Sequence, residues 1–516
     1  MSRLLGLSLL LVAVLLAAPV AADQTINVMN DAPMSGPDRF LVPFTVPADI
    51  TEIQIHHDDM SAENILDWGL YDPDGNFRGW GGGNTEDAIV GAQAASRSYL
   101  TGPIKAGTWN VEIGKAKILN WPETYRIDIT LRNAPTLPPQ MQRMPYTAQA
   151  PIKNEARWYA GDFHTHSIES GDAKPQIPAM IAFAKSRGLD FIELSDHNTT
   201  AQLDFYAADR PSDFLLFPGV EYTTYQGHAN GIAATKWVDH KVGVNGATIL
   251  DAARAFHTQG ALFSINHPTL EVGDVCIGCA WKHDLPADQI DAVEIETGGY
   301  RQAGVLFNRS AIAFWDALCA KGRHAAAIGG SDDHSGGIVV GFRDSPIGSP
   351  TTMVFADELS VQGILDGIKK GRTVVKLQDP TDPMIEFDAE GRDGDTVHAK
   401  STVAHAKITG AMGQAFHWVK NGSAMDDIVV DKDPFLIDLP VTPPPSGEDR
   451  IRAEVWVDGA PRTITSHVYF QTGTAIFGTP QKSGGCDTSG AGSANATLAV
   501  GLAALFGVCL RRRTRK

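Results

Sequence analysis

The chain of 516 residues carries 60 acidic and 43 basic side chains, which gives a formal net charge of -17. Its composition, 43% hydrophobic and 20% charged, is that of an ordinary globular protein and argues against long disordered tracts. An acidic chain without basic clusters in its body argues against nucleic acid and anionic membranes as main partners. The length predicts about two to four domains.

Residues 1–22 have the features of a secretory signal peptide. Arg3 precedes an apolar run over residues 4–18, and small residues lead to a cleavage site near Ala22. The run is shorter than the ~20 residues that a membrane-spanning helix needs, so cleavage is favoured over a retained anchor. We therefore expect the protein to be exported.

Alternating apolar residues predict a β-sandwich over residues 23–133. Trp68, Trp80 and Trp109 either pack in its core, which is the favoured interpretation, or bind carbohydrate at its surface. A metal site at His56-His-Asp-Asp59 is disfavoured, because adjacent strand residues point to opposite faces. Four prolines within residues 134–150 indicate a linker.

Over residues 151–379, strand-like apolar runs alternate with helical stretches and end in metal-binding residue types. The first run ends in Gly161-Asp-Phe-His164-Thr-His166, where the spacing places both imidazoles on one face of a strand. Such a pair alone is a weak signal for metal. Further endings follow in this order: Ser195-Asp-His197-Asn, Pro218-Gly-Val-Glu221, Gly227-His228, Asn266-His267-Pro and Gly330-Ser-Asp332-Asp-His334.

This order of motifs predicts an α/β fold with a metal centre at the carboxyl ends of its strands, where barrel enzymes carry their chemistry. A series of such endings is hard to produce by chance. The helices between them are well delimited: Pro178 suits a first turn, Gly188 follows a last turn, and Ser360 suits an N-cap.

Two cysteines, Cys276 and Cys279, stand close together in a loop of the same region. In an exported protein they most simply form a disulfide. A zinc site that includes His283 is the alternative. Cys319 is expected to be buried in a helix.

Short alternating strands return over residues 380–478 and predict a second β-sandwich. The tail, residues 479–516, contains Cys486, an apolar run and a basic end. It resembles the tripartite C-terminal sorting tails of some Gram-negative bacteria, particularly the myxobacterial type. That resemblance implies a transient membrane anchor, processing by a membrane sorting protease, and a location in the periplasm or on the outer cell surface.

The motifs of the central region resemble those of the polymerase and histidinol phosphatase (PHP) superfamily of metal-dependent hydrolases, and more narrowly its CehA/McbA-type branch. The resemblance covers about residues 157–377. It implies a distorted (βα)7-type PHP barrel, flanked here by the two β-sandwiches. It also implies two or three divalent ions, and mixed His/Asp/Glu ligation suits zinc, manganese or iron.

The resemblance further implies which residues bind each ion. The first ion would be held by His164, His166, Glu221 and Asp332. The second would be held by Glu221, His228 and His267. The third would be held by Asp172, His197 and His334. Catalytic roles are expected for Glu221, His228 and His334, while Asp196 is expected to orient a ligand histidine.

Three functions are compatible with this centre. Paired ions lower the pKa of a bridging water and stabilise charge on the entering and leaving oxygens, which suits a phosphomono- or diesterase that acts through a metal-bridging hydroxide on a small-molecule substrate. A carboxyl-ester or carbamate hydrolase and a non-catalytic surface binding protein are the alternatives. Arg301, Arg309 and Arg343 are candidates for a phosphate clamp, but each is as easily a surface residue. The flanking sandwiches are expected to be accessory.

Overall fold

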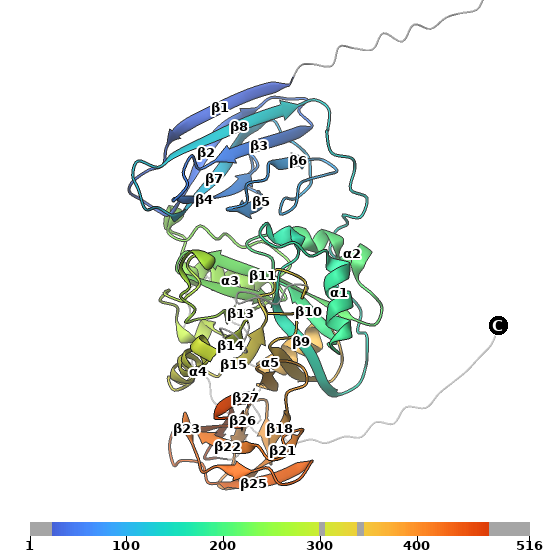
Figure 1. Ribbon diagram of the computed structural model, residues 1–516, viewed down its shortest axis with the longest axis vertical. Coiled ribbons are helices and arrows are strands. Elements are labelled where there is room, and N and C mark those ends of the chain that lie inside the picture. Colours follow the sequence, from blue (N-terminus) through green and yellow to red (C-terminus); the bar gives the residue numbers. More distant parts are fainter. Residues whose placement is uncertain (1–22, 299–304, 338–344, 474–516) are drawn as a thin grey trace, which may run out of the picture. The chain divides into compact units, whose positions relative to one another are not determined.

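A computed structural model of the chain describes residues 23–298, 305–337 and 345–473 (Figure 1). The predicted signal peptide and sorting tail lie outside the described residues, as do Arg301, Arg343 and Cys486. In the described part of the chain, no helix is long and apolar enough to cross a membrane.

The first part of the chain, residues 24–132, forms two antiparallel sheets. One has the strand order β1-β8-β3-β6 and the other β2-β7-β4-β5 (Figure 1). Trp68 and Trp109 are buried in one apolar core with Ile129, so the core interpretation is confirmed for these two tryptophans. Trp80 is buried outside that core, in a small cluster with Tyr71 and Phe77. The strands are β1 Gln24–Asp31, β2 Arg39–Val46, β3 Glu52–Asp58, β4 Ile65–Tyr71, β5 Phe77–Gly82, β6 Ala88–Gly91, β7 Gly107–Lys117 and β8 Thr124–Arg132.

The central part, residues 157–376, is mixed α/β and rich in strands. Its strands are β9 Arg157–Thr165, β10 Phe191–Leu194, β11 Leu215–Thr224, β12 Gly227–Ile232, β13 Leu262–Ile265, β14 Ala292–Thr297, β15 Ala326–Gly330, β16 Thr351–Ala356 and β17 Thr373–Lys376. Its α-helices are α1 Ile177–Ser186, α2 Tyr206–Asp209, α3 Ile249–Thr258, α4 Val305–Cys319 and α5 Val361–Lys369. Single 3-10 turns are η1 Ile168–Ser170, η2 Ala201–Phe205, η3 Val244–Gly246, η4 Gly273–Val275 and η5 Ala287–Gln289.

The expected α/β class is confirmed, but the strand pairings do not show a (βα)7 barrel. β9, β10 and β11 are parallel, and so are β13, β14 and β15. Between these groups β12 runs antiparallel to both β11 and β13, and no helix separates β11 from β12. The chain therefore turns back as a hairpin where a crossover helix was expected.

The helix ends follow the signals read from the sequence. Pro178 lies in the first turn of α1, and Gly188 just after it has a φ of 79°. The Ser360 hydroxyl accepts a hydrogen bond from the Gly363 N–H at the start of α5. Cys319 is buried at the end of α4, as expected.

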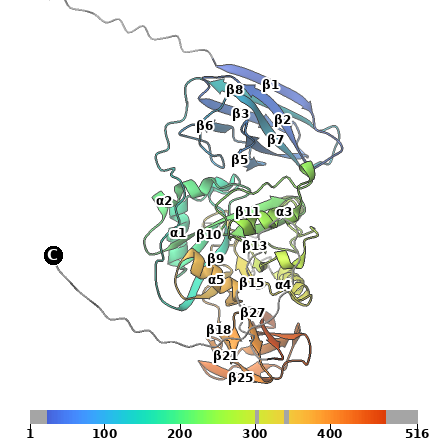
Figure 2. The same ribbon diagram turned by 180° about the vertical axis from the view of Figure 1, so that it is seen from behind.

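The last described part, residues 384–471, is again all-β (Figure 2). β18, β21 and β25 form a three-stranded sheet, whereas β27 pairs antiparallel with β17 of the central part. The strands are β18 Met384–Ala389, β19 Arg392–Asp393, β20 Thr396–His398, β21 Thr402–Thr409, β22 Ala415–Lys420, β23 Ser423–Ala424, β24 Ile428–Val429, β25 Phe435–Val441, β26 Glu448–Val457, β27 Ala460–Thr465 and β28 Val468–Gln471. The β17–β27 pairing makes this region a continuation of the central sheet.

Candidate metal centre

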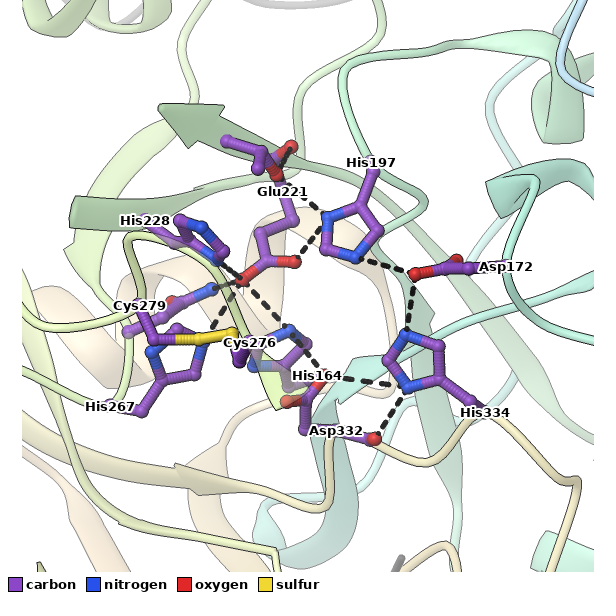
Figure 3. Close-up of a disulfide and its surroundings, with 12 residues drawn as sticks. His164, Asp172, His197, Glu221, His228, His267, Cys276, Cys279, Asp332 and His334 are labelled. Carbon is purple, nitrogen blue, oxygen red and sulfur yellow. Dashed lines mark hydrogen bonds and ion pairs between the residues drawn. A yellow bond between two sulfur atoms is a disulfide. The ribbon is translucent and has the colours of Figure 1, made fainter. Parts of the chain in front are cut away.

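The predicted ligands come together around the carboxylate of Glu221 (Figure 3). His164 lies on β9, Glu221 on β11 and His228 on β12. The remaining ligands follow strand ends: Asp172 after β9, His197 after β10, His267 after β13, and Asp332 and His334 after β15. Glu221 lies inside a strand, contrary to the expected strand ending, because pairing with β12 extends β11 to Thr224.

Five histidines surround Glu221, and the most distant of them, His166, lies with Nε2 3.5 Å from Glu221 Oε2. Its Oε1 is 3.2 Å from His164 Nε2, 3.2 Å from His228 Nδ1 and 3.2 Å from His267 Nε2. Its Oε2 is 2.7 Å from His197 Nδ1. The carboxylate thus faces the predicted ligands of all three ions, as a bridging ligand would.

Two further carboxylates link the remaining histidines. Asp332 Oδ1 is 3.2 Å from His164 Nε2 and 3.0 Å from His166 Nε2. Asp172 Oδ2 is 3.3 Å from His197 Nε2 and 3.4 Å from His334 Nε2. The predicted ligands of the first ion, including Glu221, offer ligand atoms that all lie within 4.8 Å of one another.

The donor atoms fit divalent ions. Several of the close contacts above lack hydrogen-bond geometry, and these buried atoms make no hydrogen bond: Nε2 of His164, His166 and His228, Nδ1 of His267, Oε2 of Glu221 and Oδ1 of Asp332. Buried polar atoms are ordinarily hydrogen-bonded, so a convergent group of unpartnered nitrogen and oxygen atoms indicates a missing partner. Imidazole and carboxylate are the ligands that zinc, manganese and iron accept.

The electrostatics keep Glu221 and His166 in the forms that bind metal, whereas the nearby carboxylates outweigh burial and raise the pKa of His164, His197 and His334. Burial alone would raise the pKa of Glu221, but His164, His197 and His228 lower it well below its usual range, so the carboxylate stays ionised. Burial, together with His334 and His197, lowers the pKa of His166 to about 3, so that ring stays neutral.

The backbone is strained at two of the predicted ligands. His267 has a φ of 26° and Asp332 a φ of 54°. Positive φ is uncommon for residues other than glycine and costs on the order of 1 kcal/mol or more. Strain of this kind gathers at functional sites, where the surrounding structure holds it.

Two residues to which the sequence gave no role, Glu294 and Asn266, contact the centre directly. Glu294 Oε1 is 3.2 Å from His164 Nδ1, and its Oε2 accepts the backbone N–H of His267 at 2.7 Å. Asn266 donates from Nδ2 to Glu221 Oε1 at 3.0 Å. Glu294 thereby orients two predicted ligands. Two glutamates at alternate positions of a buried strand, Val293-Glu-Ile-Glu296, were the available signal.

One expectation about an individual residue was wrong, and of the two alternatives left open for Arg309 the surface residue is the one that holds. Asp196 does not contact a ligand ring: it accepts hydrogen bonds from the N–H and the hydroxyl of Ser167, both at 2.6 Å, and so fixes the turn after β9. Arg309 donates a hydrogen bond to the carbonyl of Gly459 at 3.3 Å and does not line the cavity above the centre.

The centre forms the floor of a cavity of about 930 Å³. Asp172, His197, Glu221 and His334 line the floor, while Trp80 and the glycines that follow it line one wall. Those wall residues belong to the first β region, and Tyr225 beside them donates to Asp67 at 2.6 Å. The N-terminal sandwich is therefore not accessory, because it completes the cavity.

The predicted disulfide between Cys276 and Cys279 is confirmed, with 5.7 Å between the Cα atoms. Cys276 lines the cavity, whereas Cys279 is buried. His283, the third residue of the alternative zinc site, lies with Nε2 2.7 Å from the Thr224 hydroxyl. A metal site made of both cysteines and His283 is excluded while the cysteines are paired.

Comparison with known proteins gives only remote likenesses. No protein-family profile and no curated protein matches the chain. A two-domain protein from Bacteroides vulgatus, described as containing a predicted PHP-like metal-dependent phosphoesterase, is 19% identical with a TM-score of 0.35, over 63% of this chain and 99% of that one. The CARDB domain of a Pyrococcus furiosus protein, solved with di-metal ions, is 17% identical with a TM-score of 0.14, over 18% of this chain and 92% of that one. Scores this low establish neither the fold nor the family.

Proposed function

We propose that the protein is a metal-dependent hydrolase of the PHP type that cleaves a small-molecule ester. The convergence of unpartnered histidine and carboxylate atoms on Glu221, at the floor of a large cavity, carries this proposal. His164, His166, Glu221 and Asp332 would hold one ion, His228 and His267 with Glu221 a second, and Asp172, His197 and His334 a third. Ions bound there would supply positive charge that polarises the ester and acidifies water.

The protein's own groups then have distinct tasks. Glu221 supplies negative charge at the centre of the cluster, and Glu294 and Asn266 fix its surroundings. His228 and His334 line the cavity together with Glu221, so these three groups can reach a substrate. Trp80 and the loop of Leu270 enclose the substrate from two sides and limit the access of water.

A phosphoester is the first substrate class that we propose, because several ions around one floor match the charge that develops on a phosphoryl group. A carboxyl ester or carbamate is the second. It is favoured by one observation: among the described residues that line the cavity there is no lysine or arginine. A binding protein without turnover is less favoured, since the predicted ligand set is complete.

Hydrolysis of p-nitrophenyl phosphate, bis-(p-nitrophenyl) phosphate and p-nitrophenyl acetate separates these classes. We expect at least one ester to be cleaved by protein that carries about two or more ions per chain, and activity to be lost with chelator and restored with metal. Stoichiometric metal without cleavage of any ester would favour the binding protein. Less than one ion per chain after growth with added metal would overturn the proposal.

The substitution Glu221→Gln tests the bridging role. The amide keeps the shape but removes the negative charge that faces ligands of three predicted ions, so metal content should fall by at least one ion. Turnover should fall on the order of 100-fold or more, since even groups that only orient ligands contribute about 10–100-fold. Glu155→Gln, at an exposed position two residues before β9, is the control. Full metal content and near-normal turnover in Glu221→Gln would refute bridging.

We also propose export, followed by processing of the tail by a membrane sorting protease, in the periplasm or at the outer surface of a Gram-negative bacterium. The disulfide supports an oxidising compartment. Mass spectrometry of the protein from its native host should find a mature N-terminus near Asp23. An intact N-terminus at Met1 would contradict export by this signal.

A further inference from the structure

The disulfide lies against the predicted second ion site (Figure 3). Cys279, His228 and His267 are all buried, and their potential ligand atoms lie within 4.8 Å of one another. Each of the two rings contacts Glu221 through one nitrogen, while the other nitrogen, Nε2 of His228 and Nδ1 of His267, has no partner. One sulfur of the disulfide therefore lies within 4.8 Å of a ring nitrogen of each histidine, and each histidine has one nitrogen without a partner.

The backbone around Cys279 is fixed independently of the S–S bond. Gly278 packs against Tyr225 so closely that an added Cβ would lie 2.5 Å from the Tyr225 Cα. The Trp281 N–H donates to the Pro268 carbonyl at 2.9 Å, and the Lys282 N–H donates to the Gln226 carbonyl at 2.7 Å. Breaking the S–S bond would leave Cys279 where it is.

We infer that Cys279 is a latent ligand of the second ion, withheld from the metal by its bond to Cys276. The inference rests on the proposed function, because it requires an ion at His228 and His267. A disulfide sulfur carries no thiolate charge and is a poor ligand, whereas a thiolate binds zinc and similar ions strongly. Reduction would add a soft, charged ligand to a site of imidazole and carboxylate, and would fill a position that a substrate could otherwise use.

The two cysteines differ in a way that directs the chemistry. Cys276 is half-buried and lines the cavity, whereas Cys279 is 1% exposed. A thiolate of a small dithiol entering the cavity attacks the Cys276 sulfur, the S–S bond breaks, and its electron pair leaves on Cys279 as a thiolate. The second thiol of the reductant then displaces Cys276 from the mixed disulfide, which leaves two reduced cysteines and one oxidised dithiol. The leaving sulfur is the one that faces the histidines.

The variants Cys276→Ser and Cys279→Ser form a matched pair for the test. Each destroys the disulfide and each leaves one cysteine of the pair, but only Cys276→Ser leaves a thiol beside His228 and His267. Cys319, Cys486 and Cys509 remain in both variants, so any signal from them is common to the two. The full chain is loaded with Co²⁺, and thiolate-to-cobalt charge-transfer absorption is recorded together with the cobalt content.

We expect the charge-transfer band in Cys276→Ser and in reduced wild type, and no band in Cys279→Ser or in oxidised wild type. Cys276→Ser should also bind the second ion roughly tenfold tighter than Cys279→Ser. Cobalt binding without a band in Cys276→Ser and in reduced wild type, or bands of equal strength in the two variants, would overturn the inference and leave the proposed function intact. No cobalt in any form would overturn both. The reduced wild type decides the matter if Cys276→Ser fails to fold.

Discussion

The two β regions contact the central region through the same kind of buried ionic cluster. On the N-terminal side, Arg39 Nη1 is 2.9 Å from Glu112 Oε1, which is also 3.1 Å from Nε2 of His240. On the C-terminal side, Arg452 Nη1 is 2.8 Å from Asp316 Oδ1, and the same oxygen is 3.4 Å from Nε2 of His467. In both clusters an arginine and a histidine share one carboxylate.

The surroundings of the two clusters differ. The Arg39 guanidinium lies 4.7 Å over the ring of Tyr225 and 5.7 Å over that of Trp80, and both rings line the cavity. The Arg452 guanidinium lies 5.3 Å over Trp315, a core residue that does not line the cavity. Equal chemistry at two junctions therefore does not mean equal relevance to the site: the N-terminal cluster supports the cavity wall, and the C-terminal cluster supports only the fold.

Removing one carboxylate from each cluster should separate these roles most strongly. Glu112→Gln leaves the charge of Arg39 buried without compensation, at a cost of about 3–5 kcal/mol in the free energy of unfolding. Asp316→Asn should cost less, about 1–3 kcal/mol, because that carboxylate is partly exposed. Only Glu112→Gln should disturb the cavity wall, because only that cluster packs against Trp80 and Tyr225. We therefore expect a lower kcat/KM of the folded protein in Glu112→Gln alone.

The measurements are urea unfolding and kcat/KM for whichever ester of the panel is cleaved. In Asp316→Asn, kcat/KM per folded molecule should stay within about twofold of wild type, as for a surface change remote from the site. If the two variants lose kcat/KM equally, the contrast between the two junctions is wrong.

The same contrast can be drawn with tryptophan. Trp80 and Trp418 are both buried, and in each the indole N–H has no partner. Trp80 lines the cavity, with its ring 6.2 Å from that of His197. Trp418 packs in the core of the C-terminal region.

Trp80→Phe and Trp418→Phe should each cost about 1–2 kcal/mol of stability, since both remove similar buried volume. Only Trp80→Phe should also raise KM, by roughly threefold to tenfold, because it reshapes the wall that holds the substrate. Steady-state kinetics on both variants decides this. An unchanged KM in Trp80→Phe would show that Trp80 does not help to hold the substrate.

That the candidate ligands come together was predictable from the sequence, and the contacts at the two junctions were not, for physical reasons. His164 and His166 follow from local spacing on a strand, and Asp332 and His334 follow from residue types at a strand end. Glu112 and His240 are separated by 128 positions, and no local pattern pairs them. The contact between these two side chains depends on how the N-terminal and central regions pack together. The alternation of residues along a strand carries no information about that packing.

Buried acids were missed for a related reason. Glu294 lies on a strand that reads as apolar core, and its role appears only when His164 and His267 are seen beside it. The hairpin β11–β12 was missed because Glu221 was expected to end its strand. Tertiary pairing with β12 overrides that local signal.

The smallest expected effect is a difference in pH dependence between the junction of the central and C-terminal regions, where His324 lies, and the N-terminal β region. His324 stacks on Tyr469, between Asp395 at 2.9 Å and Glu448 at 3.0 Å. Burial would lower its pKa, but Asp395 and Glu448 raise it above the ordinary value. His57 in the N-terminal region stacks on Trp68, and burial lowers its pKa to about 4.

The contributions of His324 and His57 to the free energy of unfolding change with pH in opposite directions. The folded protein holds the His324 proton more tightly than the unfolded chain, so this stabilisation is fully present below a pH of about 6.5 and is lost as the pH rises through the raised pKa. His57 is held neutral, so its contribution is present above a pH of about 6.5 and is lost as the pH falls toward about 4.

Unfolding free energies of wild type, His324→Gln and His57→Gln across this pH range test the prediction, since the metal centre titrates alike in all three and cancels in the differences. The difference in unfolding free energy between wild type and His324→Gln should become smaller as the pH rises above about 6.5. The change should be less than about 1 kcal/mol, because the His324 side chain is a quarter exposed. The difference in unfolding free energy between wild type and His57→Gln should instead become smaller as the pH falls. Parallel pH profiles for the two variants would show that neither histidine is held as described, and the two regions would then not differ in their response to pH.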